Sequence, residues 1–593
     1  MQAEQIRDIL LKGLQFQQNQ SYQEALQCYD KVLSFLPTQT DALYLKAIIY
    51  IRLFRFTEAI ELLQKALEQS ANMSIDRRSE CHAALGSAYQ QLKHFEEADQ
   101  AFLSAIELTP KSADRIVDRA QCLLARGKAD EAEKMAQKAL KIDPEHLRAQ
   151  IASAESLFQT WRVLEYISKL QSALKSHPAN MDLICQYLMS INYLPDDHLH
   201  SAAKEHINIG STLQPFLRKS IRQETVESSI DPKQELRVGF ISPDLKKHSV
   251  TFFLLPLLKA LKPITSIRTY CYSTVAYEDQ ITQKVKESSD HFRKLAGSRE
   301  FEKIHKDQLH LLIDLASHSN PPHFEALVRS PKVVPYYVQW LGYPNTSGFP
   351  IFDCRFVDST SDPEIPEMEP SSERKIRLEP CFLCYEPPED APEVEKLPAL
   401  SGTPFTLGSF NNLNKINSAT VELWARLLRK IPNARVLFKT ALLSKPSVRE
   451  RLVQTFGKHG VDPDRLILAE RTASMYEHLN TYNKIDLALD PFPYGGTTTT
   501  FEALFMGCPV VTLTGFQHRS RVTHSILSAL DLEDWVAETP QQYVEIASKT
   551  SQKPELLGEL RTHLREKLLF SRLCDGDAFA KEFTRACREV IQS

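Results

Sequence analysis

The feature that most constrains the fold of this chain is a set of small residues that recurs through its first third. Alanine takes the same place at four points, separated by steps of 34, 39 and 34 residues. A second set follows seven positions after each alanine, and a third set precedes each by twelve. The three sets are Ala25, Ala59, Ala98 and Ala132; Val32, Ala66, Ala105 and Ala139; and Gly13, Ala47, Gly86 and Ala120. Such a fixed period predicts paired antiparallel helices that approach closely at their small residues.

A period of 34 residues is that of the tetratricopeptide repeat. We predict five helical pairs over residues 1–180, the last of them degenerate because Tyr166 replaces the small residue. The 39-residue step predicts a lengthened loop near residues 73–77. Stacked repeats form a solenoid with a concave surface, which we expect to hold a protein or peptide. The alternative, that the array joins two copies into a homodimer or only stiffens the chain, stays open.

Composition limits the partners and the compartment. A chain of 593 residues is too long for one core and predicts three or four domains. The net charge of −4 favours neither nucleic acid nor an acidic membrane surface. The most apolar run, residues 250–258, is too short to span a bilayer, and the N-terminus lacks a signal core. Cys381 and Cys384 have no second pair with which to complete a zinc site. We expect a soluble cytoplasmic protein with reduced thiols.

From about residue 236, short apolar segments alternate with helical ones, which predicts two parallel sheets covered by helices. The predicted divisions are 1–180 for the repeats, 181–235 for a helical connector, 236–385 for a first lobe, 386–404 for a linker, and 405–593 for a second lobe with the terminal helices. The predicted strands are 236–242, 267–273, 311–316, 336–341, 354–357, 405–410, 435–439, 465–469, 485–489 and 509–513. Two such lobes place a ligand cleft between the carboxyl ends of their strands.

The strongest binding signal is the run Asp490-Pro-Phe-Pro-Tyr-Gly-Gly-Thr-Thr-Thr-Thr-Phe-Glu502. It predicts a helix that begins near Thr498 after two glycines, and therefore unpaired N–H groups and a positive dipole end that suit an anion. Glu502, one turn further on, could accept hydrogen bonds from a sugar hydroxyl. The arrangement fits a nucleoside diphosphate. The alternative is an ordinary strand–helix crossover with threonine as N-cap, because the run lacks the lysine of a P-loop.

Polar side chains also follow several of the predicted strands, at the edge where ligands of such folds bind. They are Asp244 and His248 after 236–242; Ser317, His318 and Ser319 after 311–316; Asn411, Asn412, Asn414 and Lys415 after 405–410; and Lys439 at the end of 435–439.

Four segments carry a resemblance to a known family: Ser242-Pro-Asp-Leu-Lys-Lys-His-Ser-Val250, Trp340-Leu-Gly-Tyr-Pro-Asn-Thr-Ser-Gly348, Phe410-Asn-Asn-Leu-Asn-Lys-Ile416 and the threonine-rich run. Together they resemble the O-GlcNAc transferase and SPINDLY family, in a bacterial-type member, over nearly the whole chain. The resemblance implies a tetratricopeptide solenoid followed by an α/β GT-B region of two Rossmann-like lobes. It also implies an inverting, metal-independent glycosyltransferase that moves a sugar from a nucleotide-sugar to Ser or Thr of an acceptor protein.

The resemblance assigns a donor site position by position. Lys415 matches the lysine that neutralises the departing diphosphate, where a fixed cation stabilises the growing charge. The three threonines match residues that contact the phosphates, Glu502 matches a ribose ligand, and His478 matches a histidine near the base. The donor-binding set is Asn412, His478, Gly496, Thr497, Thr498, Thr499 and Glu502.

The resemblance also implies catalytic histidines. His248 matches a residue proposed as general base or acceptor-positioning group, and an imidazole suits proton transfer near neutral pH. His318, on a neighbouring turn, is a candidate partner, although a satisfied structural histidine is the alternative. Lys439 and Arg521 are secondary candidates for phosphate contacts.

No metal or other cofactor is implied. Two Asp-x-Asp triplets, Asp462–Asp464 and Asp575–Asp577, have the spacing of metal-dependent glycosyltransferases, but the first lies in a predicted loop and the second starts a predicted helix, where capping explains it. UDP-GlcNAc is the first expectation for the donor. GDP-fucose is the second, because Asn414 and Met475 stand where the human-type enzyme has tyrosine and lysine, and because the threonine run looks closer to the SPINDLY branch. A non-catalytic repeat scaffold is a third hypothesis, against which the intact motifs argue.

Overall fold

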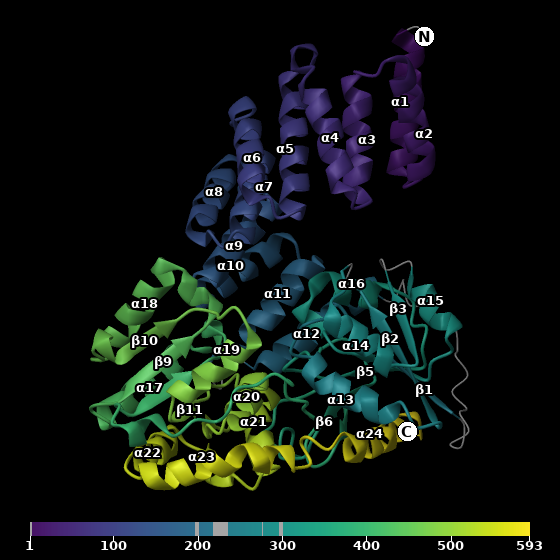
Figure 1. Cartoon of the computed structure of the whole chain (residues 1–593). Helices are drawn as coiled ribbons and strands as arrows, with labels where there is room; N and C mark the ends of the chain where they lie inside the picture. The colour runs from purple at the N-terminus through teal and green to yellow at the C-terminus, as the bar shows by residue number, and fades with distance from the viewer. Residues whose placement is uncertain (1–2, 196–200, 218–234, 275–276, 296–299, 593) are drawn as a thin grey trace. The chain divides into compact units, whose positions relative to one another are not determined.

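The structure is a computed structural model, and it describes residues 3–195, 201–217, 235–274, 277–295 and 300–592 (Figure 1). The chain divides into two compact units, Met1–Ser176 and His177–Ser593. Within the described residues, no helix is both long and apolar enough to cross a membrane.

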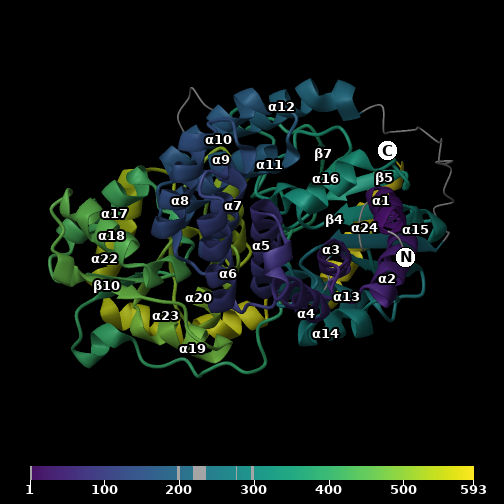
Figure 2. The ribbon, with the colours of Figure 1, turned by 90° about the horizontal axis from the view of Figure 1, so that it is seen from above.

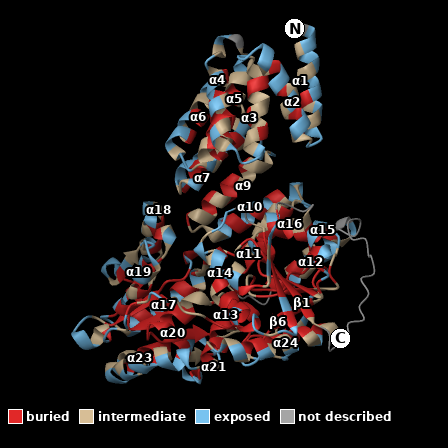
Figure 3. Ribbon diagram, turned by 45° about the vertical axis from the view of Figure 1, so that its right-hand side comes forward, coloured by how far each residue is buried: buried red, intermediate tan, exposed pale blue. Residues whose placement is uncertain are grey.

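The first unit consists of five antiparallel helical pairs, as the repeat spacing predicts. Its helices are α1 (Ala3–Gln18), α2 (Tyr22–Phe35), α3 (Thr40–Arg52), α4 (Phe56–Leu67), α5 (Ile75–Gln91), α6 (Phe95–Leu108), α7 (Ala113–Ala125), α8 (Ala129–Ile142), α9 (Leu147–Gln159) and α10 (Val163–Ser176). The repeat alanines are buried, and Figure 3 shows buried positions recurring along these helices. Tyr166, in the degenerate fifth pair, is also buried and packs 4.9 Å from Phe158.

Close helix contact explains why the repeat positions are small. A Cβ atom added to Gly13 would lie 2.6 Å from the ring of Tyr29, and one added to Gly86 would lie 2.8 Å from the ring of Phe102. Both aromatic rings are buried, so neither can move aside without disturbing the core. The small residues are therefore required by the packing of each helical pair.

The connection between α4 and α5 is lengthened, as the 39-residue step predicts: it spans residues 68–74 and includes the short 3-10 helix η1 (Ser70–Asn72), whereas the equivalent connections span residues 36–39 and 109–112. Most of residues 73–77 lie in the first turn of α5, which has 17 residues where α3 and α7 have 13. Ser74 caps this turn by accepting the N–H of Arg77 at 3.2 Å. The extra residues are therefore shared between a longer connection and a longer α5, whose first turn Ser74 caps.

The second unit contains a parallel seven-stranded sheet in the order β3-β2-β1-β4-β5-β6-β7. The strands are β1 (Leu236–Ser242), β2 (Ile267–Ser273), β3 (His291–Lys294), β4 (Leu311–Asp314), β5 (Tyr336–Gln339), β6 (Cys354–Val357) and β7 (Arg374–Arg377). Helices α13 (Thr251–Leu261), α14 (Gln280–Ser288), α15 (Phe301–Lys306) and α16 (Pro321–Arg329) lie between them in the chain. The predicted parallel lobe is confirmed, with two edge strands, β3 and β7, added.

A second parallel sheet has the order β10-β9-β8-β11-β12-β13. Its strands are β8 (Thr406–Ser409), β9 (Arg435–Lys439), β10 (Leu466–Ala469), β11 (Leu487–Leu489), β12 (Val510–Leu513) and β13 (Val536–Ala537). The helices of this lobe are α17 (Ser418–Lys430), α18 (Pro446–Gly457), α19 (Met475–Asn480), α20 (Thr498–Phe505), α21 (His518–Ser528), α22 (Pro540–Ser551) and α23 (Pro554–Leu569). Seen from above, the helices of the two lobes gather around separate sheets (Figure 2).

Two of the predicted segments pack against the first lobe. The connector helices α11 (Met181–Ile191) and α12 (Ala202–Leu217) belong to the second unit, and α11 packs on α16 of the first lobe; residues 196–200 and 218–234 of the predicted connector lie outside the described part. The terminal helix α24 (Gly576–Gln592) falls in the predicted second lobe, but it packs on α13 and β7 of the first (Figures 1 and 2). Its buried phenylalanines, Phe579 and Phe583, complete the apolar cover over Trp340.

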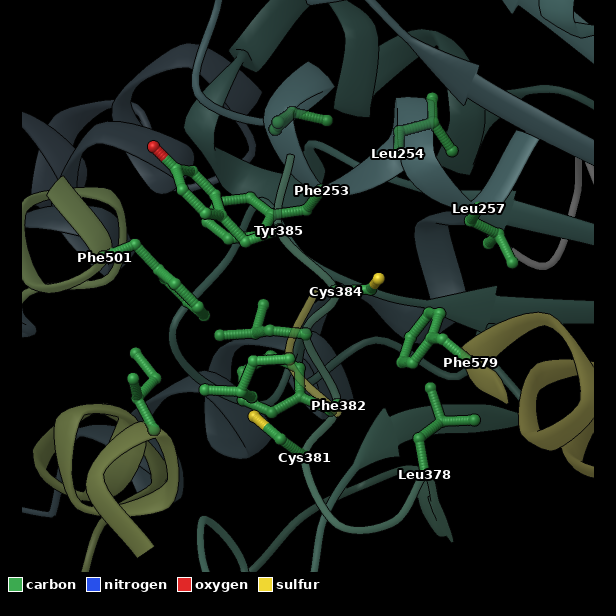
Figure 4. Close-up of a cluster of buried hydrophobic side chains, with 14 of the residues drawn as sticks. Phe253, Leu254, Leu257, Leu378, Cys381, Phe382, Cys384, Tyr385, Phe501 and Phe579 are labelled. Atoms are coloured by element: carbon green, nitrogen blue, oxygen red, sulfur yellow. The ribbon is translucent and has the colours of Figure 1, made fainter. Parts of the chain in front are cut away.

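One apolar core continues through both lobes. In Figure 4, Phe253 of α13, Tyr385 at the end of the first lobe and Phe501 of α20 converge. The rings of Tyr385 and Phe501 stack at 4.7 Å. Cys381 and Cys384 are free thiols buried in the same core, in agreement with the structural role expected for them. The helix with the predicted anion site is therefore anchored by its own Phe501 to the junction of the lobes.

Candidate functional site

The start of α20 has the open N–H groups that the sequence predicts. Thr497 is the N-cap residue, but its side chain makes no capping hydrogen bond. Among the described residues, the N–H groups of Thr497, Thr498 and Thr499 make no hydrogen bond. Three unpaired donors therefore lie at the positive end of the helix. The alternative of an ordinary threonine cap does not fit this geometry.

The two glycines before the helix are required by their surroundings. A Cβ atom on Gly495 would lie 2.7 Å from a carboxylate oxygen of Asp490, and one on Gly496 would lie 2.5 Å from the hydroxyl of Thr499. Asp490 is buried and accepts the N–H of Gly496 at 2.6 Å and the hydroxyl of Thr512 at 2.7 Å. The turn is therefore fixed from beneath by Asp490, so that it can present the N–H groups that follow it.

Lys415 supplies the cation that the turn itself lacks. It ends the 3-10 helix η5 (Leu413–Lys415), and its Nζ donates to the carbonyl of Gly495 at 2.7 Å. The ammonium also lies 3.9 Å from the centre of the Tyr494 ring. Burial lowers the pKa of Lys415 to about 8, and the Asp490 carboxylate opposes this shift. The charge is held at the entrance of α20 without a direct carboxylate partner among the described residues.

The two asparagines before Lys415 hold η5 in place. Asn412 caps η5 by accepting the N–H of Asn414 at 3.1 Å, and its side chain is exposed. Asn411 is buried and accepts the hydroxyl of Thr499 at 3.2 Å. This bond ties η5 directly to the start of α20. Asn412, the predicted donor-binding residue, is exposed to solvent, whereas Asn411 is buried and holds Thr499.

His478 and Glu502 meet one turn into α20. His478 Nε2 lies 2.9 Å from a carboxylate oxygen of Glu502, which Tyr482 also approaches at 3.3 Å through its hydroxyl. Nδ1 of His478 is hydrogen-bonded to Nζ of Lys439, the last residue of β9. Burial lowers the pKa of Lys439 to about 8. This part of the site therefore includes Lys439 and Tyr482 in addition to His478 and Glu502.

His248 lies on the first lobe and opens onto a cavity of about 380 Å³. The cavity has an apolar floor that includes Phe252 and Ile281, and Met475 of α19 forms part of its wall. The His248 imidazole is 44% exposed, and its Nδ1 lies 3.9 Å from the Asp244 carboxylate. Since Met475 is on the same helix as His478, this cavity links the predicted catalytic histidine to the second lobe.

His318 is buried, in contrast to His248. It is 1% exposed; Nε2 contacts the carbonyl of Ser347 at 2.7 Å, and Nδ1 lies 3.4 Å from the thiol of Cys185 in α11. Its ring packs 4.0 Å from Phe324, and burial lowers its pKa to about 4. A neutral imidazole with both nitrogens engaged fits the alternative of a structural histidine, and this geometry does not support a catalytic partnership with His248.

The remaining candidates, Arg521 and the two Asp-x-Asp triplets, make structural contacts. Arg521 donates to backbone carbonyls of Thr360 and Gly515 and serves packing between the lobes. The first residue of each Asp-x-Asp triplet caps a helix: Asp462 accepts the N–H of Asp464, and Asp575 accepts that of Ala578. In the part of the chain that the structure describes, no three His, Cys, Asp or Glu side chains gather as metal ligands would.

Sequence reasoning missed Tyr494 and Tyr482 and gave Lys439 too little weight. Tyr494 stands in the quoted motif beside the glycines, so its place next to Lys415 could have been noticed. Lys439 ends a strand whose other residues are mostly apolar. A lysine in such a strand indicates a buried polar contact, because lysines are rarely buried without a partner. The position of Tyr482 follows only from the packing of its ring 4.4 Å from Phe410.

The site can bind an anion that carries two or more negative charges, next to a group with hydroxyls. Three N–H groups, a helix dipole and the Lys415 ammonium meet the anion. Glu502 can accept hydroxyl hydrogens, and the apolar cavity adjoins the same helix, α19, that carries His478. This combination matches the diphosphate, ribose and neighbouring groups of a nucleotide-sugar.

Comparison with known proteins agrees with this description. The model of glycosyl transferase family 41 matches residues 194–382 and 400–583, and tetratricopeptide repeat models match 38–111 and 83–146. A probable UDP-N-acetylglucosamine–peptide N-acetylglucosaminyltransferase SPINDLY of Petunia hybrida is 33% identical over 432 residues, covering 70% of this chain and 45% of that protein. The corresponding protein SEC of Arabidopsis thaliana is 25% identical over 367 residues, covering 60% of this chain and 37% of that protein.

Among solved structures, a mutant of the O-GlcNAc transferase of Thermobaculum terrenum matches with a TM-score of 0.78 and 26% identity, covering 88% of this chain and 99% of that one. The chain spans about half the length of the curated SPINDLY relatives that it matches. On the matched segments of both lobes, the chain belongs to glycosyl transferase family 41.

Proposed function

We propose that the protein transfers a sugar from a nucleotide-sugar to a hydroxyl of Ser or Thr in an acceptor protein. One observation carries the proposal: the Lys415 ammonium and the three open N–H groups of Thr497, Thr498 and Thr499 meet at the start of α20. A diphosphate leaving group needs this pairing, because its negative charge grows as the bond to the sugar breaks.

The reaction that fits is a single displacement with inversion. The acceptor hydroxyl oxygen attacks the anomeric carbon, and the bond from that carbon to the phosphate oxygen breaks with its electron pair left on the diphosphate. The hydroxyl proton passes to a base, for which His248 is the candidate because it is exposed and lies beside Asp244. Lys415 and the helix dipole take the place of a metal ion, so we propose that no metal is needed.

We propose UDP-GlcNAc as the donor. The names of relatives of both branches, SPINDLY and SEC, describe N-acetylglucosaminyltransferases, and the structural relative is an O-GlcNAc transferase. GDP-fucose is the second candidate. It is favoured by Met475, an apolar residue in the cavity wall, where the human-type enzyme has lysine.

Thermal unfolding with UDP and with GDP tests the donor. A ligand that binds only the folded state adds about 2.7 kcal/mol to its stability at one hundred times Kd. We expect UDP to raise the Tm of the second unit and GDP to leave it unchanged. Stabilisation by GDP alone would overturn the GlcNAc assignment. Failure of all nucleotide-sugars to label protein, by wild type and Lys415→Ala alike, would favour the scaffold hypothesis.

The repeat array is the proposed holder of the acceptor protein. Its five helical pairs form a unit of their own, and solenoids of this kind bind extended peptides along one face. We also propose that the chain can form a homodimer. Sedimentation across a hundredfold range of concentration tests this, and a constant mass of 67.6 kDa would exclude it.

A further inference from the structure

Three side chains form a hydrogen-bonded relay that ends at the donor site. Lys439 Nζ contacts His478 Nδ1, and His478 Nε2 contacts Glu502 at 2.9 Å. The three come from different elements: the end of β9, the middle of α19 and the second turn of α20. We propose that Lys439 is a positioning residue, which holds His478 in one tautomer so that His478 aims the Glu502 carboxylate at the ligand. The proposal rests on the donor site described above.

The direction of the relay follows from what each group can donate. A lysine ammonium has only donors, so Nδ1 of His478 must accept. A neutral imidazole that accepts at Nδ1 carries its hydrogen on Nε2, and that hydrogen points at Glu502. Both hydrogen bonds to the Glu502 side chain, from His478 and from Tyr482, reach the same oxygen, Oε2. Oε1 is left to accept from a ligand hydroxyl.

The surroundings keep Lys439 in this role. Its side chain is 4% exposed and lies 5.7 Å from the centre of the Phe410 ring. The charged groups that act on the ammonium are Glu502, Glu477 and Arg471, and two of the three are carboxylates. The His478 imidazole thus lies between the ammonium and Glu502. Because it accepts a hydrogen bond from Lys439 at Nδ1, it donates one to Glu502 at Nε2. Without Lys439, either nitrogen of His478 could carry the hydrogen, and the carboxylate would lose its fixed donor in part of the population.

A double-mutant cycle tests whether Lys439 acts through His478. The variants are Lys439→Met, His478→Leu and their combination, with Lys458→Met as the control because Lys458 is exposed. The readout is the Kd of the nucleoside diphosphate that stabilises the wild type. We expect Lys439→Met to weaken binding about tenfold at about pH 7, where Lys439 is an ammonium, because one charge-assisted hydrogen bond is lost. In the His478→Leu background, the same change should alter Kd less than about twofold. Additive effects would overturn the proposal. A Lys439→Met variant that binds the nucleoside diphosphate as the wild type does contradicts the relay.

The tautomer can be read without a nucleotide. Spectra of ¹⁵N-histidine-labelled wild type, with the His478 signals assigned by their absence in His478→Leu, should show the hydrogen on Nε2. A hydrogen on Nδ1 overturns the relay even if the nucleotide binds as proposed. Conversely, a wild type that shows the Nε2 tautomer but binds neither UDP nor GDP supports the relay and overturns the proposed function alone.

Discussion

Replacing Lys415 by methionine should abolish most of the activity without weakening the fold. The ammonium is partly buried against the Gly495 carbonyl and the Tyr494 ring, and burial lowers its pKa to about 8. A lysine whose pKa is lower in the folded state than in the unfolded state destabilises the folded state at neutral pH. Methionine has a similar shape and no charge. The Tm of the variant should therefore equal or exceed that of the wild type.

The expected loss of rate follows from the charge that is removed. A unit charge about 4 Å from an opposite one interacts by about 4 kcal/mol at an effective dielectric constant of about 20. Lys415 is only partly buried, so solvent screens part of this attraction and about 2–3 kcal/mol remains for the departing diphosphate. That energy corresponds to a fall in kcat of about 30- to 150-fold.

Initial rates of protein labelling from the nucleotide-sugar measure this loss, with melting curves on the same samples. Lys458→Met is the matched control, since Lys458 is an exposed lysine of the same lobe. Two results would refute the reasoning. One is a Lys415→Met enzyme that turns over within about threefold of the wild type. The other is a loss of rate accompanied by a lower Tm, because the lysine would then support the fold and not the leaving group.

Four further predictions concern pH and packing. Donor binding should weaken as pH rises through about 8, because the Lys415 ammonium, with its pKa of about 8, is needed and is half deprotonated at that pH; a flat Kd from about pH 7 to 9.5 would contradict this. Buried His318, with its pKa lowered to about 4, should lower the free energy of unfolding as pH falls from about 6.5 to 4, because the unfolded state binds the proton more readily. In chemical denaturation, His318→Leu should make the free energy of unfolding depend less on pH over this range, and the folded fraction of the variant should keep the kcat of the wild type. Tyr494→Leu removes the aromatic face 3.9 Å from Lys415 and should lower kcat about 3- to 30-fold with little change in Tm. Gly86→Ala places a Cβ atom 2.8 Å from the Phe102 ring and should destabilise the repeat unit by about 1–3 kcal/mol in a melting curve, while the nucleotide Kd stays the same.

Most of the fold could be predicted because its strands are buried. The predicted bounds of β1, β2, β6 and β9 agree with the structure, since each is a largely apolar run that ends at turn residues. The edge strands β3, His-Phe-Arg-Lys, and β7, Arg-Lys-Ile-Arg, escaped prediction. An edge strand has only one neighbour and carries charged side chains, so it lacks the apolar run that identifies an inner strand.

The site was partly predictable for a different reason. Lys415 and the threonine turn lie in local motifs whose chemistry can be recognised from adjacent residues. His318 occupies a similar strand-end turn, but its role depends on Cys185 of α11, which is 133 residues away in the chain. The Lys439 relay likewise joins three elements that are distant in sequence. Local pattern identifies a group that could act, whereas long-range packing decides whether it is buried, engaged or free to meet a ligand.

One helix connects the donor turn to the opposite lobe. In α21, the carbonyl of Arg519 accepts the N–H of Gly495 at 3.1 Å, and Thr523 donates to the carbonyl of Gly496 at 3.0 Å. The same helix holds the first lobe through Ser525, which donates to the buried Asp358 carboxylate at 2.6 Å.

Because both sets of bonds are on α21, this helix joins the glycine turn to the contact between Ser525 and Asp358. If the turn moved, α21 would have to lose these hydrogen bonds or move with it. The packing of the first lobe, which carries His248, is therefore connected through one helix to the glycines that precede α20.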